Sequence, residues 1–255
     1  MGTVSKALNL LDIIKSPAVR LGLTEISKLA GFDKATTRRL LLELIANGFV
    51  EQDEVNKHYV LGAALQMLGK AREERFPLFK TIRPIVRNLA EATGETVHAT
   101  EYGAGVLISV CAHESTKANR VSLVVGQKLP LHATASGMAF LAASSPAFVE
   151  TFMRKPRDKF TINTPVEADQ LLKLVAQAKT RGYSISNQSM EEGIHSVASA
   201  FVNTSGKPIG TVAIAMPSIR ASKTKIDEFG IAVAVAAQEI SLKLFGRPAI
   251  LHNES

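Results

Sequence analysis

Apolar residues recur at helical spacing in three stretches within the first 50 residues of the chain. These stretches are residues 4–16, 24–30 and 34–46, and short polar breaks separate them. Apolar residues three and four positions apart share one face of a helix, so each stretch predicts a helix with one buried face. Ser16-Pro17 is the predicted end of the first helix, because the residue before a proline disfavours helical geometry.

The second and third predicted helices carry signals at their ends. Thr24 is expected to cap the second helix, and Gly31 is expected to end it, because glycine tolerates the positive φ of a helix C-terminus. Asp33 offers a side-chain acceptor as the N-cap of the third helix, and Asn47-Gly48 supplies its end. The tight break between the two helices predicts a helix-turn-helix.

The third predicted helix has two unlike halves. Residues 34–39, KATTRR, carry three cations and two threonines, whereas Leu40, Leu41, Leu44 and Ile45 give the rear half an apolar face. Arginine and threonine side chains can contact base edges and phosphates in the major groove of DNA. The front half therefore predicts a DNA-contacting end, and the rear half predicts attachment to a core.

A hairpin is predicted directly after the third helix. Two apolar runs, residues 49–50 and 59–61, flank a polar turn at residues 53–57. A hairpin in this position is typical of the wing of a winged helix, from which Lys57 and His58 could reach DNA phosphates. In the alternative interpretation, the hairpin only covers the core of the helical unit.

The pattern changes beyond the hairpin. Residues 63–72 predict a helix, residues 72–76 a charged linker, and residues 78–93 a longer amphipathic helix. After these come six predicted strands, at residues 96–102, 106–113, 120–125, 183–186, 196–203 and 208–216. A loop is predicted at residues 126–131, and helices within residues 132–143, 146–153, 168–182 and 223–245. This order predicts an α+β fold with a mostly antiparallel sheet.

Length and composition agree with two ordered domains. The chain has 255 residues, of which 46% are hydrophobic and 21% charged. Its net charge of +7 favours a polyanionic partner, and the stretch from Lys15 to Arg39 alone holds 6 cations and 2 acids. The single cysteine, Cys111, excludes an internal disulfide and a cysteine-based zinc site. The sequence carries neither a signal-peptide run nor a membrane-spanning stretch, so a cytoplasmic protein is expected.

Four segments, in order along the chain, resemble the IclR family of bacterial transcriptional regulators. They are LTEISKLAG with TTRRLLLEL, LPLHATASGMAFLA, RGYSISNQSMEEGIHSVASAFVNTSGKPIGTVAIAMP, and DEFG with AAQEIS near the end. The resemblance implies a winged helix-turn-helix at residues 1–62, a linker helix at residues 63–77 and a GAF-like effector-binding and oligomerisation domain at residues 78–255. It also implies a homodimer or homotetramer.

Two sets of candidate residues follow from the pattern and the resemblance. The DNA-binding set is Lys34, Thr36, Thr37, Arg38, Arg39, Arg20, Lys57 and His58, with Thr36, Thr37 and Arg38 as expected base contacts. For an effector, small residues that open a helix near residues 133–137 expose backbone N–H groups that suit a carboxylate. The effector-binding set is Leu129, Leu131, Ala135, Ser136, Asn187, Ile194, Ala213 and Ala215. In the alternative interpretation, the small residues only allow close helix–sheet packing.

These features predict a ligand-responsive regulator of a catabolic operon, a repressor or alternatively an activator. As a homo-oligomer it would bind a palindromic operator in double-stranded DNA and respond to a small organic acid. No catalysis, cofactor, metal or membrane contact is expected. The histidines of the second half lack a metal-binding spacing and are expected to be structural or to lie on the surface. Ser136 does not lie in a nucleophile-elbow motif. The alternative from another class is a metabolite-binding or enzymatic α+β protein with a non-functional helix-turn-helix.

Overall fold

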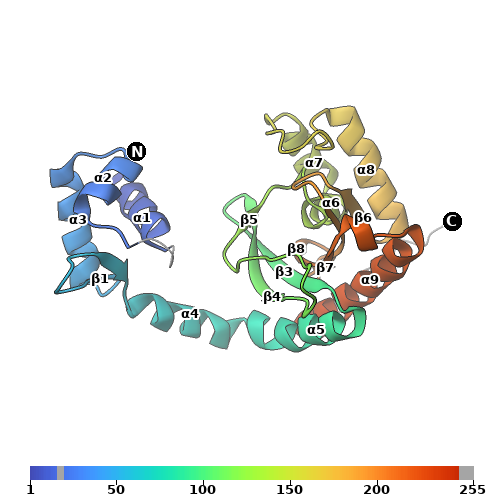
Figure 1. Cartoon of the computed structure of the whole chain (residues 1–255), viewed down its shortest axis with the longest axis horizontal. Coiled ribbons are helices and arrows are strands. Elements are labelled where there is room, and N and C mark those ends of the chain that lie inside the picture. The colour runs from blue at the N-terminus through green and yellow to red at the C-terminus, as the bar shows by residue number, and fades with distance from the viewer. Residues whose placement is uncertain (16–19, 247–255) are drawn as a thin grey trace. The chain divides into compact units, whose positions relative to one another are not determined.

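The structure, a computed structural model, describes residues 1–15 and 20–246. Its contacts divide the chain into two compact units, Met1–Phe76 and Pro77–Ser255. The first unit contains helices α1–α4 and a two-stranded hairpin, and the second contains a six-stranded sheet with helices α5–α9 (Figure 1). The predicted end of the first helix at Ser16-Pro17 lies outside the described residues.

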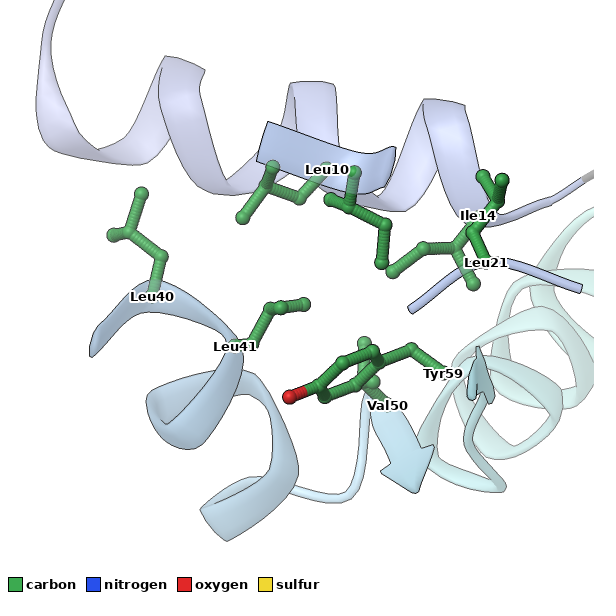
Figure 2. Close-up of a cluster of buried hydrophobic side chains, with 8 residues drawn as sticks. Leu10, Ile14, Leu21, Leu40, Leu41, Val50 and Tyr59 are labelled. Carbon is green, nitrogen blue, oxygen red and sulfur yellow. The ribbon is translucent and has the colours of Figure 1, made fainter. Parts of the chain in front are cut away.

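The first unit has one hydrophobic core to which the helices and the hairpin all contribute. Its elements are α1 (Thr3–Ile14), α2 (Leu23–Ala30), α3 (Lys34–Ala46), β1 (Val50–Gln52) and the antiparallel β2 (Tyr59–Leu61). The buried side chains of the core are Leu10, Ile14, Leu21, Ile26, Leu40, Leu41, Val50 and Tyr59 (Figure 2). The predicted three helices and hairpin are confirmed.

The start of α2 differs from the prediction. Gly22, rather than Thr24, is the N-cap, because the helix begins one residue before Thr24. The Glu25 carboxylate accepts a hydrogen bond from the Gly22 backbone N–H at 3.1 Å and so contributes to the capping. The other two end signals are confirmed: Gly31 ends α2 with φ 69°, and the Asp33 carboxylate accepts a backbone N–H of α3 at 2.7 Å.

Helix α4 (Ala64–Arg75) follows the hairpin and ends just before the second unit. It extends three residues beyond the predicted helix, into the stretch predicted as a linker, because the Arg and Glu residues there favour helix. It ends at Phe76, which precedes a proline and therefore disfavours helical geometry. No residue of α4 is buried among the described residues, so the core of this chain stabilises α4 little.

The second unit is built around a sheet with the strand order β5-β4-β3-β8-β7-β6, in which all neighbours are antiparallel. The strands are β3 (Thr96–Gly103), β4 (Val106–His113), β5 (Lys128–Leu129), β6 (Ser184–Asn187), β7 (Ile194–Val202) and β8 (Pro208–Pro217). Ala104 and Gly105 form the two-residue turn between β3 and β4, with φ of 51° and 85°. Positive φ at both positions matches the twist of the paired strands.

Helices cover both faces of this sheet. Helices α5 (Leu78–Thr93) and α9 (Lys223–Phe245) pack against each other and against the sheet, and α6 (Ala135–Ala143) packs on β7 and β8 with α8 (Ala168–Arg181) behind it. Figure 1 shows α6 and α8 on one side of the strands and α5 and α9 on the other. Helix α7 (Pro146–Met153) and the 3-10 turn η1 (Ser218–Arg220) complete the unit. The predicted α+β fold is confirmed.

The segment at residues 120–125 was predicted as a strand, and this prediction is wrong. The Val121 carbonyl accepts a hydrogen bond from the Thr96 hydroxyl at 2.6 Å, and the Glu114 carboxylate accepts one from the Leu123 backbone N–H at 3.4 Å. Side chains thus satisfy backbone groups that a strand would pair in a ladder. The strand beside β4 is instead β5, which lies within the predicted loop.

Candidate nucleic-acid interface and ligand cavity

Helix α3 presents its cationic side chains to solvent. Lys34, Arg38 and Arg39 are exposed, and Thr36 is partly exposed. They lie near the N-terminus of the helix, whose backbone N–H groups and dipole add to the positive potential. This end of α3 therefore offers charged and hydroxyl donors to a polyanion.

Thr37 does not share this exposure, which corrects its prediction as a base contact. Its side chain is 0% exposed, and its hydroxyl donates to the backbone carbonyl four residues earlier at 2.9 Å. Leu40 and Leu41 follow three and four residues later, so helical periodicity places all three on the core face. Thr37 therefore helps to fix α3 on the core, and Thr36 and Arg38 remain as predicted base contacts.

The hairpin turn is held by an acidic side chain. The Asp53 carboxylate accepts two backbone N–H bonds at 2.9 and 3.0 Å; these bonds, together with the charge of Arg20, lower the pKa of Asp53. Arg20 and Lys57 are exposed cations beside this turn. The His58 ring lies next to Gly22, and its Nδ1 is buried without a partner among the described residues. His58 is therefore less available to DNA than Lys57.

A cavity of about 80 Å³ lies in the second unit where α6 begins. Predicted effector residues that line it are Leu129, Ala135, Ser136, Ile194 and Ala215. These residues come from β5, α6, β7 and β8, which are far apart in sequence. The fold therefore gathers most of the predicted set around one cavity.

Three predicted effector residues do not line this cavity. Leu131 belongs to a core cluster with Leu107 and Phe140, and Asn187 is exposed at the end of β6. Ala213 lies in a layer of four alanines that packs α6 against the sheet. For Ala213 the packing interpretation of the small residues is correct.

Serines on neighbouring strands form part of the cavity wall on the sheet side. Ser186 on β6 pairs with Ser196 on β7, which pairs with Ala215 on β8. Side chains of directly paired residues point to the same face of a sheet. These three residues line the cavity together with His98 of β3, so one side of the cavity carries several hydroxyl groups.

The first turn of α6 forms another part of the wall. The Thr134 hydroxyl caps the helix by accepting the Gly137 backbone N–H at 3.0 Å. A methyl group on Gly137 would lie 2.2 Å from the Leu131 carbonyl oxygen, so the preceding loop can approach α6 only because residue 137 is glycine. Ala135 and Ser136 lie in this first turn and line the cavity. The N–H groups of such a turn favour an anion.

His98 is a buried polar group on the cavity wall. Its side chain is 4% exposed, its Nε2 lies 3.3 Å from the Ser136 hydroxyl, and its Nδ1 has no partner among the described residues. Burial lowers its pKa to about 4, so the imidazole is neutral at neutral pH. The neutral ring can therefore hold the Ser136 hydroxyl through Nε2.

The loop segment that contains Val121, Ser122 and Leu123 closes one side of the cavity. The Thr96 hydroxyl donates to the Val121 carbonyl, and the Ser122 hydroxyl donates to the Glu114 carboxylate, both at 2.6 Å. Hydrogen bonds to a charged carboxylate are among the stronger ones. This wall is therefore anchored to β3 and to the loop after β4.

A buried ion cluster anchors the same loop from a second direction. The side chain of Glu95 is 2% exposed and accepts hydrogen bonds from Arg220 Nε and Nη2 at 2.7 and 2.6 Å and from Lys117 Nζ at 2.9 Å. Burial opposes the ionisation of Glu95, but these bonds outweigh it and lower the pKa. Arg220 Nη1 also donates to the Asn119 carbonyl at 2.9 Å. The cluster ties the loop to η1 and to the start of β3.

Met190 and Glu191 supply another part of the wall. The hydroxyls of Thr161 and Thr164 donate to the carbonyl oxygens of the two residues before Met190, both at 2.7 Å. Among the described lining residues, Glu191 carries the formal charge at neutral pH, and it is exposed. Uncharged donors and the α6 N-terminus, rather than a Lys or Arg side chain, would therefore receive an anion in this cavity.

Sequence reasoning missed His98, Ser186, Ser196 and the loop at residues 121–123 as cavity residues. The alternation of Ser184 and Ser186 in β6 was a usable signal, because every second residue of a strand lies on one face. The serines of β7 do not alternate, so Ser196 had no such signal. No local signal identified His98, whose place depends on the pairing of β3 with β8.

Two structural features bear on other classes of function. Within residues 1–15 and 20–246, no three His, Cys, Asp or Glu side chains gather as a metal site would require. In the same part of the chain, no helix is both long and apolar enough to cross a membrane.

Comparison with known proteins places both units in one family. Residues 3–54 match the IclR helix-turn-helix domain, and residues 72–242 match the C-terminal domain of the bacterial transcriptional regulator IclR. Transcriptional repressor IclR of Escherichia coli is 32% identical over 96% of this chain and 90% of its own length. The Acetate operon repressor of Salmonella typhimurium is 31% identical over the same shares.

A solved structure agrees with these sequence relatives. The putative IclR transcriptional regulator from Silicibacter sp. matches with a TM-score of 0.85 and 32% identity, over 95% of this chain and 96% of that one. The similarity therefore includes both the exposed α3 surface and the unit that holds the cavity. The chain belongs to the IclR family of bacterial transcriptional regulators.

Proposed function

We propose that this chain represses a catabolic operon and changes its affinity for a palindromic operator when a small organic acid enters the cavity beside α6. The observation that carries the proposal is the presence, in one chain, of an exposed cationic helix and a buried cavity at a helix N-terminus. The names of two relatives, Transcriptional repressor IclR and Acetate operon repressor, support repression of an operon. Activation is the alternative outcome of the same mechanism.

In this proposal α3 lies in the major groove. Thr36 and Arg38 contact base edges, whereas Lys34 and Arg39 contact phosphates. The exposed cations Arg20 and Lys57, with a smaller contribution from His58, contact the DNA backbone beside the hairpin. The exposure of the α3 cations supports these roles, because phosphates can reach them without any rearrangement of the core.

The effector carboxylate would bind the backbone N–H groups of Ala135 and Ser136. The hydroxyls of Ser136 and Ser196 can complete its hydrogen bonds, with the His98 Nε2–H donating to the Ser136 oxygen. Leu129, Ile194 and Ala215 would surround the apolar part of the acid. A volume of about 80 Å³ favours an acid with few carbon atoms.

We further propose a homodimer or homotetramer, since a palindromic operator needs two copies of α3. Val4 and Leu8 on α1 are 73% and 60% exposed, and Met67 and Leu68 on α4 are 72% and 57% exposed. These apolar side chains lie on helices that a second copy can cover. We assign residues 1–62 to DNA binding, residues 63–77 to the linker, and residues 78–255 to effector binding and oligomerisation.

The same proposal excludes a catalytic role. Ser136 contacts a neutral histidine at 3.3 Å, but it begins a helix and is not held in a strained elbow. We therefore propose a cytoplasmic, non-enzymatic regulator that uses neither a cofactor nor a metal. In this proposal the effector acts by raising the population of the conformation that binds it.

The decisive experiment uses an operator selected from a pool of random double-stranded DNA. Affinity of the full chain for this operator should fall steeply, by about 10³-fold or more, between about 50 and 200 mM salt. Addition of short-chain oxo and hydroxy acids should shift the affinity and raise the melting temperature of the protein. A flat salt response, or turnover of an acid without any change in DNA binding, would favour the metabolite-binding or enzymatic alternative.

A further inference from the structure

The second unit has a larger hollow at the opposite end of α6. Its volume is about 680 Å³, and its described lining comes from the second half of α6, the C-terminal end of α8, the β7–β8 turn and the middle of α9. We call it the α6–α8 groove. No described residue lines both this groove and the cavity at the start of α6. The groove is therefore separate from the proposed effector site.

One part of the groove is an aromatic wall. Tyr102 and Phe140 are stacked, with ring centroids 4.3 Å apart and an angle of 24° between the ring planes. Phe148 meets both rings edge to face, with each centroid distance 5.8 Å. Tyr102 and Phe148 are partly exposed, so part of the aromatic surface remains open to a ligand.

The charge of the groove has one sign. Lys179 and Lys207 line it, both are exposed, and neither forms an ion pair with a residue that the structure describes. The described lining contains no Asp or Glu. A hollow lined by one sign of charge concentrates potential and attracts counter-charged solutes. This is the reverse of the α6 cavity, where Glu191 supplies the charge.

Two neutral donors add to the lysines. The Tyr102 hydroxyl and the Gln238 amide line the groove and form no hydrogen bond with any described residue. Burial raises the pKa of Tyr102, so its hydroxyl remains a donor at neutral pH. Both groups can therefore donate hydrogen bonds to acceptor atoms of a ligand.

We propose that the α6–α8 groove is a second ligand site, which binds an organic anion with a flat aromatic body. The exposed parts of Tyr102 and Phe148 would receive the body, and Lys179 and Lys207 would bind its carboxylate, sulfonate or phosphate. A volume of about 680 Å³ lies within the range of known small-molecule sites. The site requires neither operator binding nor an occupied effector cavity, so it stands or falls independently of the proposed function.

The test uses 1-naphthoate as the probe and neutral 1-naphthamide as its matched control, titrated into the full chain by calorimetry. One naphthoate should bind per chain, and naphthamide should bind more weakly. The double variant Lys179→Gln/Lys207→Gln should weaken naphthoate binding about fivefold, because each exposed charge contributes modestly. Lys173→Gln is the control variant, since Lys173 is an exposed lysine of α8 that does not line the groove.

A second variant keeps the aromatic wall and removes only its donor. Tyr102→Phe should weaken naphthoate binding about threefold, the effect of one exposed hydrogen bond. Equal naphthoate affinity in the double variant and in Lys173→Gln would overturn the proposal. So would an affinity that falls in Ser136→Val and not in the double variant, because naphthoate would then occupy the α6 cavity. Absence of naphthoate binding to the unaltered chain would also overturn the proposal. If sedimentation of the double variant then shifted to a smaller assembly, the groove would be an interface between copies.

Discussion

Helices α3 and α6 begin in the same way and lie in opposite surroundings. Each has an extended N-cap residue whose side chain accepts the backbone N–H three positions later, at 2.7 Å from Asp33 and at 3.0 Å from Thr134. Beyond the cap, α3 exposes three cations, whereas α6 is buried from Ala135 to Leu141. The same local structure therefore serves a surface that meets a large polyanion and an enclosed site that admits a small ligand.

The buried surroundings of α6 predict the largest effect. Gly137→Ala places a methyl group 2.2 Å from the Leu131 carbonyl oxygen, and the three atoms nearest to it all belong to the Leu131 backbone, which cannot turn aside as a flexible side chain could. We expect the free energy of unfolding of the second unit to fall by about 3 kcal/mol. Gly103→Ala is the control, because nothing lies within 4 Å of the added methyl there. Equal denaturant midpoints for the two variants would contradict the close approach at α6.

On α3 the largest expected effect is on DNA binding. Arg38→Ala should weaken binding to the selected operator about 100-fold, because two copies each lose a base contact. The thermal stability of the protein should stay unchanged, since the Arg38 side chain is exposed. A gel-shift titration measures the affinity, with Arg87→Ala in the second unit as the matched control. Similar losses in both variants would mean that the arginines act only through net charge.

On the α6 side a pH dependence is expected from the buried His98. His98 has a pKa of about 4 in the folded protein against 6.5 for a free histidine, so the unfolded chain binds its proton more tightly between these values. The contribution of His98 to the free energy of unfolding is fully present above pH 6.5 and is lost as the pH falls toward 4. His98→Gln should remove about 2 kcal/mol of the stability difference between about pH 7 and pH 4.5.

Denaturant unfolding at the two pH values measures this difference. His113→Gln is the control, because His113 is a partly exposed residue on β4. This variant should show the same stability difference between the two pH values as the unaltered protein. An unchanged stability difference in His98→Gln would show that the imidazole is not held neutral beside Ser136.

The smallest effects should come from the caps that the two helices share. Thr134→Ala should lower the free energy of unfolding of the second unit by about 1 kcal/mol. Asp33→Ala should speed amide hydrogen exchange in the first turn of α3 and leave the second unit unchanged. If Asp33→Ala instead altered exchange around α6, the two units would not unfold independently.

The two helices also differ in how far the sequence predicted them. Capping and cationic signals are local, so the ends of α3 and its exposed cations could be predicted from short stretches. Thr37 was misassigned because two adjacent threonines look alike in sequence, although helical periodicity places only Thr36 toward solvent. The cavity depends on strand pairing across more than 100 residues, as between His98 and Ala213. Its lining on β3 and in the loop before β5 therefore had no local signal.

The layer of Ala135, Ala139, Ala198 and Ala213 has a consequence for divergence within the family. It seals the middle of the space between α6 and the sheet, with the small cavity beyond Ala135 and the larger groove beyond Ala139. Substitutions that reshape one hollow need not open into the other, as long as these methyl groups persist. Each end of α6 can then acquire a new chemical preference by separate mutations, while the alanines themselves tolerate little enlargement.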